Sequence, residues 1–150
     1  MRLSDFLSPE CVSLALAGST REEILAELVR LLRIPESDSA ALIQVLQRRE
    51  QLGSTGVGRG IAIPHCRTPI ASRLRLAFGQ HPTGVAYNAI DGQPVFSFFL
   101  IVAPPIEISN VYLPVLGRIA QVAKEPDVPE RLRTLTSADA LLGLLAEKGV

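Results

Sequence analysis

A glycine-rich run, GSTGVGRG at residues 53–60, constrains the fold of this chain more than any other segment. It holds four glycines in eight residues. Glycine loses so much conformational freedom on ordering that such a run predicts a loop, not a helix or a packed strand. The next residues, GIAIPH, alternate Ile61 and Ile63 as in a strand, and Pro64 ends it because proline has no N–H to donate. The sequence therefore places His65 at a strand terminus directly behind a loop.

Strands and helices alternate along the rest of the chain. Residues 11–16, 74–79 and 95–102 have the patterns of strands, and the last is apolar enough to be covered on both faces. Helices are predicted at about 20–33, after Ser37 as far as Gly53, from Asn110, after Asp127 and after Ser137. This alternation predicts an α/β fold in which helices cover a central sheet. A chain of 150 residues suits one hydrophobic core, so 1–150 is predicted to be a single domain.

Two of the helix starts are predicted from capping residues. Ser19 stands three residues before Glu22, which is the spacing of a capping box. Asn110 is a candidate cap for the third helix, and Pro114 then lies in the first turn, where a missing N–H costs little. The residues predicted to be buried by that helix are Leu113, Leu116, Ala120 and Ala123.

Charge and cysteine content exclude several classes of protein. Lys+Arg and Asp+Glu each total 15, so the chain lacks the positive excess typical of nucleic-acid-binding proteins. Cys11 and Cys66 lie far apart and form no CxxC pair, which predicts neither a disulfide scaffold nor a zinc site. No apolar run reaches the about 18 residues that a membrane span requires. These features predict a cytoplasmic protein with no bound metal or cofactor and no membrane insertion.

His65 is the main candidate for chemistry. A neutral imidazole is a nucleophile, and backbone N–H groups of the neighbouring loop can bind phosphate oxygens. Ser54 and Thr55 would add hydroxyl donors, and Arg49 an always-charged guanidinium. These features suit a phosphoryl acceptor, but a lone histidine near a strand end is more often structural, so the residues alone leave both interpretations open.

The neighbouring Cys66 suggests a small hydrolase as a further reading of the same residues. That reaction needs an orienting acid and an oxyanion site, and no matched set of Cys, His and Asp or Asn is evident. Adjacent strand residues point to opposite faces, so Cys66 is predicted to be a buried, inert thiol. His81, in the turn-like stretch GQHPTG, is predicted to be a solvent-exposed loop residue.

The same stretch resembles a known family. RE at 49–50, STG at 54–56 and GIAIPH at 60–65 are similar to the sequence around the phosphorylated histidine in IIA domains of the bacterial sugar phosphotransferase system, of the fructose–mannitol type. The resemblance extends over nearly the whole chain. The segment DGQPVFSFFLIVAP is most similar to the nitrogen-regulatory members.

The resemblance implies a mixed sheet flanked by helices on both faces, and a phosphoryl group accepted by His65 from a histidine-containing phosphocarrier protein. Arg49 would stabilise the phosphate. Tyr112 stands where many members have a second histidine, and Arg59 where they usually have an acidic or amide residue. Phosphate-binding residues implied for the loop are Ser54, Thr55, Gly56 and Arg59.

Three functions are compatible with this resemblance. The phosphoryl group can remain as a regulatory mark read by a target protein, or it can pass to a IIB domain in fructose or mannitol uptake. The chain shows no attached IIB or membrane domain, which favours a stand-alone regulator. The third possibility is a non-phosphorylated binding module on the same fold.

Overall fold

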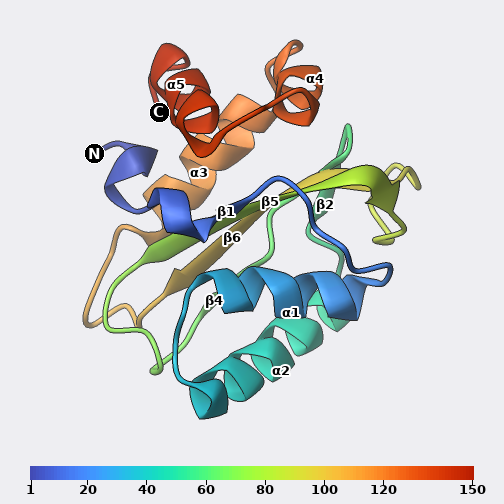
Figure 1. The fold of residues 1–150 in the computed structure, drawn as a ribbon. Coiled ribbons are helices and arrows are strands. Elements are labelled where there is room, and N and C mark those ends of the chain that lie inside the picture. The colour runs from blue at the N-terminus through green and yellow to red at the C-terminus, as the bar shows by residue number, and fades with distance from the viewer.

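The computed structural model describes all of residues 1–150, and its centre is one mixed sheet of six strands (Figure 1). The strands are β1 (Val12–Ser13), β2 (Gly56–Gly58), β3 (Ile61–Ala62), β4 (His65–Arg67), β5 (Arg75–Val85) and β6 (Val95–Ala103). The helices are α1 (Arg21–Leu31), α2 (Glu36–Leu52), α3 (Tyr112–Ala123), α4 (Val128–Arg133) and α5 (Ala138–Glu147), preceded by the short 3-10 helices η1 (Leu3–Asp5) and η2 (Pro9–Cys11). The predicted α/β fold with a mixed sheet is confirmed.

The sheet has the strand order β1-β5-β6-β3-β2, and β4 also pairs with β6. β5 runs antiparallel to β6, and β2 to β3, whereas the β1–β5, β3–β6 and β4–β6 pairs are parallel. β3 and β4 lie along β6 in one register, because Ile61 pairs with Ser97 and His65 with Ile101. β6 is buried along its length except at the half-buried Phe96, as its apolar sequence predicted.

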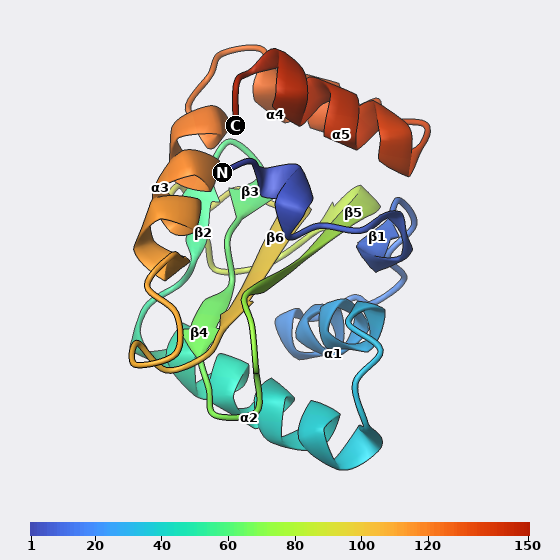
Figure 2. The same ribbon diagram turned by 90° about the vertical axis from the view of Figure 1, so that its left-hand side faces the viewer.

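Helices cover both faces of the sheet (Figures 1 and 2). α1 and α2 pack on one face, against β5 and β4, and α3 and α4 pack on the other, against β6. α5 lies beyond this second layer and contacts η1, so the two ends of the chain lie on the same side of the sheet. No helix has both the length and the apolar character needed to cross a bilayer.

The starts of α1 and α2 differ from the predictions. The cap of α1 is Thr20, whose hydroxyl accepts from the N–H of Glu23 at 3.2 Å. The Glu23 carboxylate in turn accepts from the N–H of Ser19 at 3.2 Å. The predicted Ser19–Glu22 box is therefore wrong by one residue. α2 begins at Glu36, two residues before the predicted start.

α3 begins at Tyr112, and its buried face differs from the predicted one. Val111 precedes it, not Asn110, and no side chain caps the helix. Its buried residues are Tyr112, Val115, Ile119, Val122 and Ala123. Leu113, which was predicted to be buried, is 66% exposed. Successive helical residues are rotated by about 100°, so a helix that turns Tyr112 toward the sheet must turn Leu113 away.

Two strands also differ in length from the predictions. β1 has two residues where six were predicted, and β5 continues to Val85 where an end at residue 79 was predicted. His81 therefore lies within β5, half-buried, and the prediction of an exposed loop residue is wrong. Its Nδ1 accepts from the N–H groups of Thr83 at 3.2 Å and Gly84 at 3.1 Å, where the pairing with β6 is irregular.

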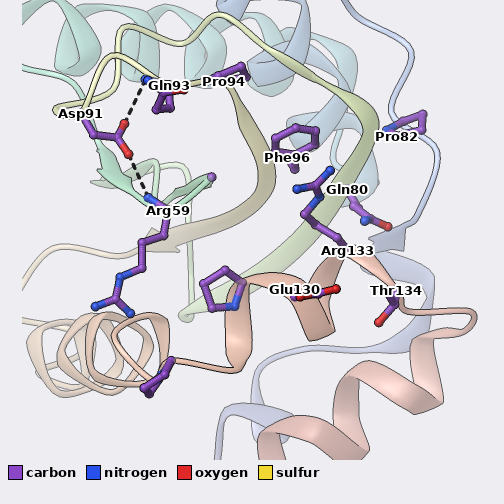
Figure 3. Close-up of a pocket in the computed structure, with 13 residues that line it drawn as sticks. Arg59, Gln80, Pro82, Asp91, Gln93, Pro94, Phe96, Glu130, Arg133 and Thr134 are labelled. Carbon is purple, nitrogen blue, oxygen red and sulfur yellow. Dashed lines mark hydrogen bonds between the residues drawn. The ribbon is translucent and has the colours of Figure 1, made fainter.

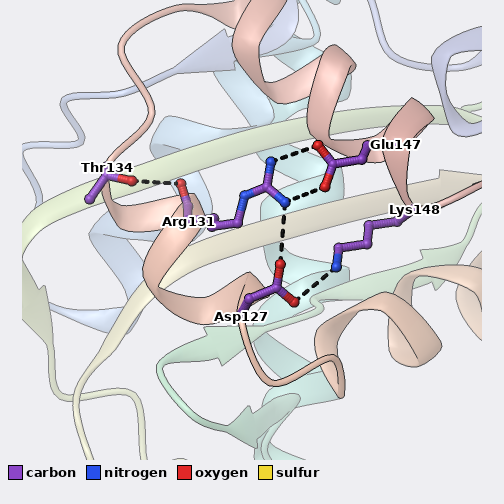
Figure 4. Close-up of polar contacts among 5 residues, drawn as sticks. All are labelled: Asp127, Arg131, Thr134, Glu147 and Lys148. Carbon is purple, nitrogen blue, oxygen red and sulfur yellow. Dashed lines mark hydrogen bonds and ion pairs between the residues drawn. The ribbon is translucent and has the colours of Figure 1, made fainter.

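Ion pairs join the last two helices (Figure 4). Asp127 accepts from Arg131 at 3.2 Å and from Lys148 at 2.9 Å, and Arg131 also donates to Glu147 at 3.0 Å. Asp127, Arg131 and Glu147 are exposed and Lys148 is partly buried, and ion pairs between solvated side chains contribute little stability each. The network fixes the C-terminal end of α5 to the start of α4, away from His65.

Candidate functional site

His65 is held against the central strand β6 by the parallel pairing of β4 with β6. β3 ends at Ala62, the chain passes through Ile63 and Pro64, and β4 begins at His65. The Pro64 carbonyl accepts from the N–H of Ile101 at 2.9 Å, so the parallel pairing continues through the proline. His65 therefore lies at a strand terminus, as predicted, but it is the start of β4 and not a residue that follows the end of β3. Its side chain is half-buried.

The backbone of Ile63 fixes the protonation of the His65 ring. His65 Nδ1 lies 2.5 Å from the Ile63 carbonyl oxygen. A carbonyl can only accept, so Nδ1 carries the proton and Nε2 keeps an unprotonated lone pair. Burial lowers the pKa of His65 below 6.5, against the raising effect of the Ile63 bond, and the charge of Arg49 lowers it further. At neutral pH the ring is therefore neutral, with Nε2 as its nucleophilic atom.

Tyr112 lies across from His65 on the other side of the site. The two ring centroids are 6.0 Å apart and the planes are tilted by 49°. Burial raises the pKa of Tyr112 to about 12, so its hydroxyl is protonated at neutral pH. This hydroxyl has no partner in the chain and is not among the buried, unsatisfied atoms, which leaves it free to donate. The structure thus brings Tyr112 to His65, as the resemblance implied.

Arg49 is the cation whose charge reaches this pair of rings. It lies in the last turn of α2, and its Nη1 donates to the Gly53 carbonyl at 2.8 Å. Its charge adds to the lowering of the His65 pKa by burial and acts against the raising of the Tyr112 pKa by burial, so the guanidinium lies within electrostatic range of both. Arginine has five N–H donors, so closing the helix end with Nη1 leaves others for a phosphate.

Ser54, Thr55 and Gly56 are bonded within their own surroundings. The Thr55 hydroxyl donates to the buried carboxylate of Glu50, and the Thr55 N–H donates to the other oxygen of Glu50 at 3.0 Å. The Ser54 hydroxyl donates to the Tyr87 carbonyl at 3.2 Å and accepts from the Gly56 N–H at 3.0 Å. The donors that the sequence assigned to phosphate are therefore engaged in shaping the loop.

Part of the glycine-rich run is a strand. Gly56–Gly58 forms β2 and pairs with β3 across an irregularity, so the prediction of a loop throughout 53–60 is wrong. Gly56 is buried, and a Cβ atom there would lie 2.7 Å from that of Ala89. Glycine is needed at this point because another part of the chain approaches the strand closely.

Arg59 bonds to Asp91 and faces a cleft lined by other residues (Figure 3). Its backbone is left-handed, with φ at 57°, and its N–H donates to Asp91 at 3.1 Å. Its Nη1 donates to the carbonyl of Lys124 at the C-terminal end of α3, at 2.7 Å. Tyr112 begins the same helix, and twelve residues of helix span about 18 Å. Arg59 instead lines an open cleft of about 980 Å³, which Phe96 and Arg133 also line. The guanidinium carbon of Arg133 lies 3.8 Å from the centroid of the Phe96 ring. The structure does not bring it to the histidine.

Two residues at this site were not assigned a role from the sequence. Glu50 is 2% exposed and accepts from Thr55 and from the Tyr87 hydroxyl, the latter at 2.9 Å. Its spacing from Leu42 and Leu46 on the apolar face of α2 was a sequence signal that the carboxylate is buried. Arg67 lies two residues after His65 in β4, which puts both side chains on one face. Its guanidinium carbon lies 4.6 Å from the Tyr112 ring centroid.

Cys66 is buried, as predicted, and burial raises the pKa of its thiol to about 12. The thiol therefore stays protonated at neutral pH, and it lies on the opposite face of β4 from His65. Neither property suits a cysteine hydrolase. The chain has no group of three or more His, Cys, Asp and Glu side chains placed to hold a metal ion.

Comparisons with known proteins agree on one family. The model of the family described as "Phosphoenolpyruvate-dependent sugar phosphotransferase system, EIIA 2" matches residues 5–148. A nitrogen regulatory protein of Pseudomonas aeruginosa is 33% identical over an aligned length of 154, and the alignment covers 98% of this chain and 96% of that protein. The crystal structure of the nitrogen regulatory protein IIA-Ntr from Neisseria meningitidis matches with a TM-score of 0.82 at 27% identity, over 95% of this chain and 98% of that one. The mannitol IIA enzyme from Escherichia coli, in complex with phosphorylated IIB, matches with a TM-score of 0.73 at 25% identity, over 93% and 96%.

Proposed function

The chain belongs to the EIIA 2 family of the phosphoenolpyruvate-dependent sugar phosphotransferase system, and we propose that it carries a phosphoryl group on Nε2 of His65 as a phosphorylation-dependent regulator. The observation that carries the proposal is the 2.5 Å bond from His65 Nδ1 to the Ile63 carbonyl. This bond leaves Nε2 as the one ring nitrogen with a free lone pair.

The transfer can be written from these residues. A histidine-containing phosphocarrier presents its phosphohistidine, and the Nε2 lone pair of His65 attacks phosphorus. The new N–P bond forms as the donor N–P bond breaks, and the released electron pair stays on the donor imidazole. Nδ1 keeps its proton, and the Ile63 carbonyl stabilises the positive charge that the ring gains. Arg49 and the Tyr112 hydroxyl are proposed to bind the phosphoryl oxygens.

The surface around the site supports a protein as the donor. Leu52, at the end of α2, is 87% exposed, and Leu113, next to Tyr112, is 66% exposed. Ile106 and Ile108, on the segment that leads to α3, are 64% and 63% exposed. These four residues lie on the chain segments next to Arg49 and Tyr112, and exposed apolar side chains are typical of protein contact surfaces. The proposed partners are the phosphocarrier and a downstream protein, which is either a regulatory target or a IIB domain.

Regulation is favoured over sugar uptake by the similarity to nitrogen regulatory proteins along almost the entire chain. Adding about two negative charges at this surface changes its complementarity to a partner more than it changes the fold. Transfer onward to a IIB domain is the alternative, and it is supported by the mannitol IIA enzyme, whose structure was determined with its phosphorylated IIB partner.

Incubation with phosphoenolpyruvate, the first enzyme of the system and the phosphocarrier, followed by intact mass measurement, tests the proposal. We expect a gain of one phosphoryl group that is labile in acid and stable in base, as phosphohistidine is. No gain in mass, with the phosphocarrier itself shown to be phosphorylated, would favour a non-phosphorylated binding module. Addition of a IIB domain then separates the two carrier functions, because a dedicated regulator should retain the group.

Replacing Arg49 with glutamine is expected to slow phosphoryl transfer to His65. A charge-assisted hydrogen bond is worth about 1.5–3 kcal/mol, which corresponds to roughly a tenfold to hundredfold loss in rate. Arg48→Gln is the matched control, because Arg48 is the exposed neighbour on the same helix turn. Rapid-quench transfer from the phosphorylated phosphocarrier gives both rates. A folded Arg49→Gln protein that reacts as fast as the control would exclude Arg49 from the phosphate site.

A further inference from the structure

Arg67 bridges the two ends of the segment that joins β6 to α3. Its Nη1 donates to the carbonyl of Pro104 at 2.9 Å and to that of Ser109 at 3.2 Å. Pro104 directly follows β6, and Ser109 comes three residues before α3. One planar guanidinium group therefore holds both ends of residues 104–109 against β4.

The same guanidinium lies on the ring of Tyr112. Its carbon is 4.6 Å from the ring centroid, within the range of a cation–π contact. The tyrosine ring is in turn 6.0 Å from the ring of His65. His65 and Arg67 project from the same face of β4, so the Tyr112 ring lies next to both of these side chains.

The start of α3 has no side-chain cap, although the Tyr112 ring itself is buried. Val111 precedes the helix, and no side chain bonds to its free N–H groups. An uncapped helix start is prone to fray, and Tyr112 is the first residue of this one. The contacts of Arg67 restrain both the backbone that leads into the helix and the ring itself.

We propose that Arg67 is a positioning residue of the phosphoryl site, which holds Tyr112 so that its hydroxyl donates to the phosphoryl group on His65. This rests on the proposed function of His65. The two Nη1 hydrogens of Arg67 are donated to backbone carbonyls, and its guanidinium makes a cation–π contact with the Tyr112 ring. The positive charge of Arg67, which lies over the ring, also makes the Tyr112 hydroxyl a better donor to an anion. A lysine has no planar group with which to bridge two carbonyls and stack on a ring at once.

A double-mutant cycle on the phosphoryl-transfer equilibrium tests this role. The proteins are wild type, Arg67→Met, Tyr112→Phe and the double variant, each equilibrated with the phosphocarrier and quantified by intact mass. Tyr112→Phe removes only the hydroxyl, and one hydrogen bond changes the equilibrium by about threefold to tenfold. We expect Arg67→Met to cause a loss of similar size and the double variant to lose no more than the larger single loss. Arg67→Lys should recover only part of the loss.

Controls separate positioning from a purely structural role. Arg73→Met, at an exposed arginine, should match wild type. Arg67→Met should unfold cooperatively, and a variant that is less stable but transfers at the wild-type equilibrium would overturn the proposal. So would losses that multiply in the double variant, because Arg67 would then act independently of the Tyr112 hydroxyl. A wild-type protein that accepts no phosphoryl group would instead contradict the proposed function itself.

Discussion

His65→Ala should accept no phosphoryl group from the phosphocarrier, whereas His81→Ala should be labelled as fully as wild type. The chain has two histidines, and only His65 has a ring nitrogen that is left free by the backbone and lies near Tyr112 and Arg49. In His81, Nδ1 instead accepts hydrogen bonds from the N–H groups of Thr83 and Gly84, in the irregular part of β5. Intact mass after the phosphotransfer reaction measures both variants directly.

The pair of histidine variants also controls for folding. His81→Ala removes the acceptor of two backbone N–H groups in β5. Its effect should therefore be confined to that part of the sheet and leave the His65 site unchanged. Circular dichroism and thermal unfolding should show both variants folded. Full labelling of His65→Ala would contradict the assignment of the acceptor. Equal loss of labelling in both variants would point to damaged folding, and the site would then be tested with His65→Gln.

Glu50→Ala should lower the free energy of unfolding by about 3–5 kcal/mol, because it removes a buried acceptor and leaves its partners unpaired. The donors affected are the Thr55 hydroxyl, the Thr55 N–H and the Tyr87 hydroxyl. The carboxylate is 2% exposed, so water does not replace it without opening the contact between α2 and the 54–56 segment. Loss of this contact should also slow phosphoryl transfer, since the segment and Arg49 flank His65 from the same end of α2.

Urea unfolding of Glu50→Ala beside Gln44→Ala measures the effect. Gln44 lies on the exposed face of the same helix, and its replacement should change the free energy of unfolding by no more than about 0.5 kcal/mol. Glu50→Gln should fall between the two, because the amide keeps one acceptor and turns an NH₂ group toward hydrogen-bond donors. A loss below about 1 kcal/mol in Glu50→Ala would show that the carboxylate is not the centre of this network.

Local signals in the sequence predicted much of this fold. The apolar run of β6 identified a central strand, and helices were correctly predicted to follow Asp127 and Ser137, where α4 and α5 begin. Each of these features depends on residues close together in the chain. Alternation within β4 likewise predicted that Cys66 would be buried on the face opposite to His65.

The features that the sequence did not predict depend on distant parts of the chain. Gly56 joins a strand because β3 and Ala89 lie beside it, and composition alone gives no sign of either neighbour. Arg59 is drawn away from His65 by Asp91 and by the carbonyl end of α3, more than thirty residues further along the chain. The register of α3 was misjudged because Leu113 is the more apolar residue, whereas Tyr112 is the one that contacts His65.

The position of the phosphoryl group on the histidine ring tests the central claim most directly. In ¹H–¹⁵N spectra of the phosphorylated protein that report the imidazole nitrogens, we expect phosphorus at Nε2 of His65 and a proton retained on Nδ1, in its hydrogen bond to the Ile63 carbonyl. Phosphorylation at Nδ1, or at any residue other than His65, would contradict the account.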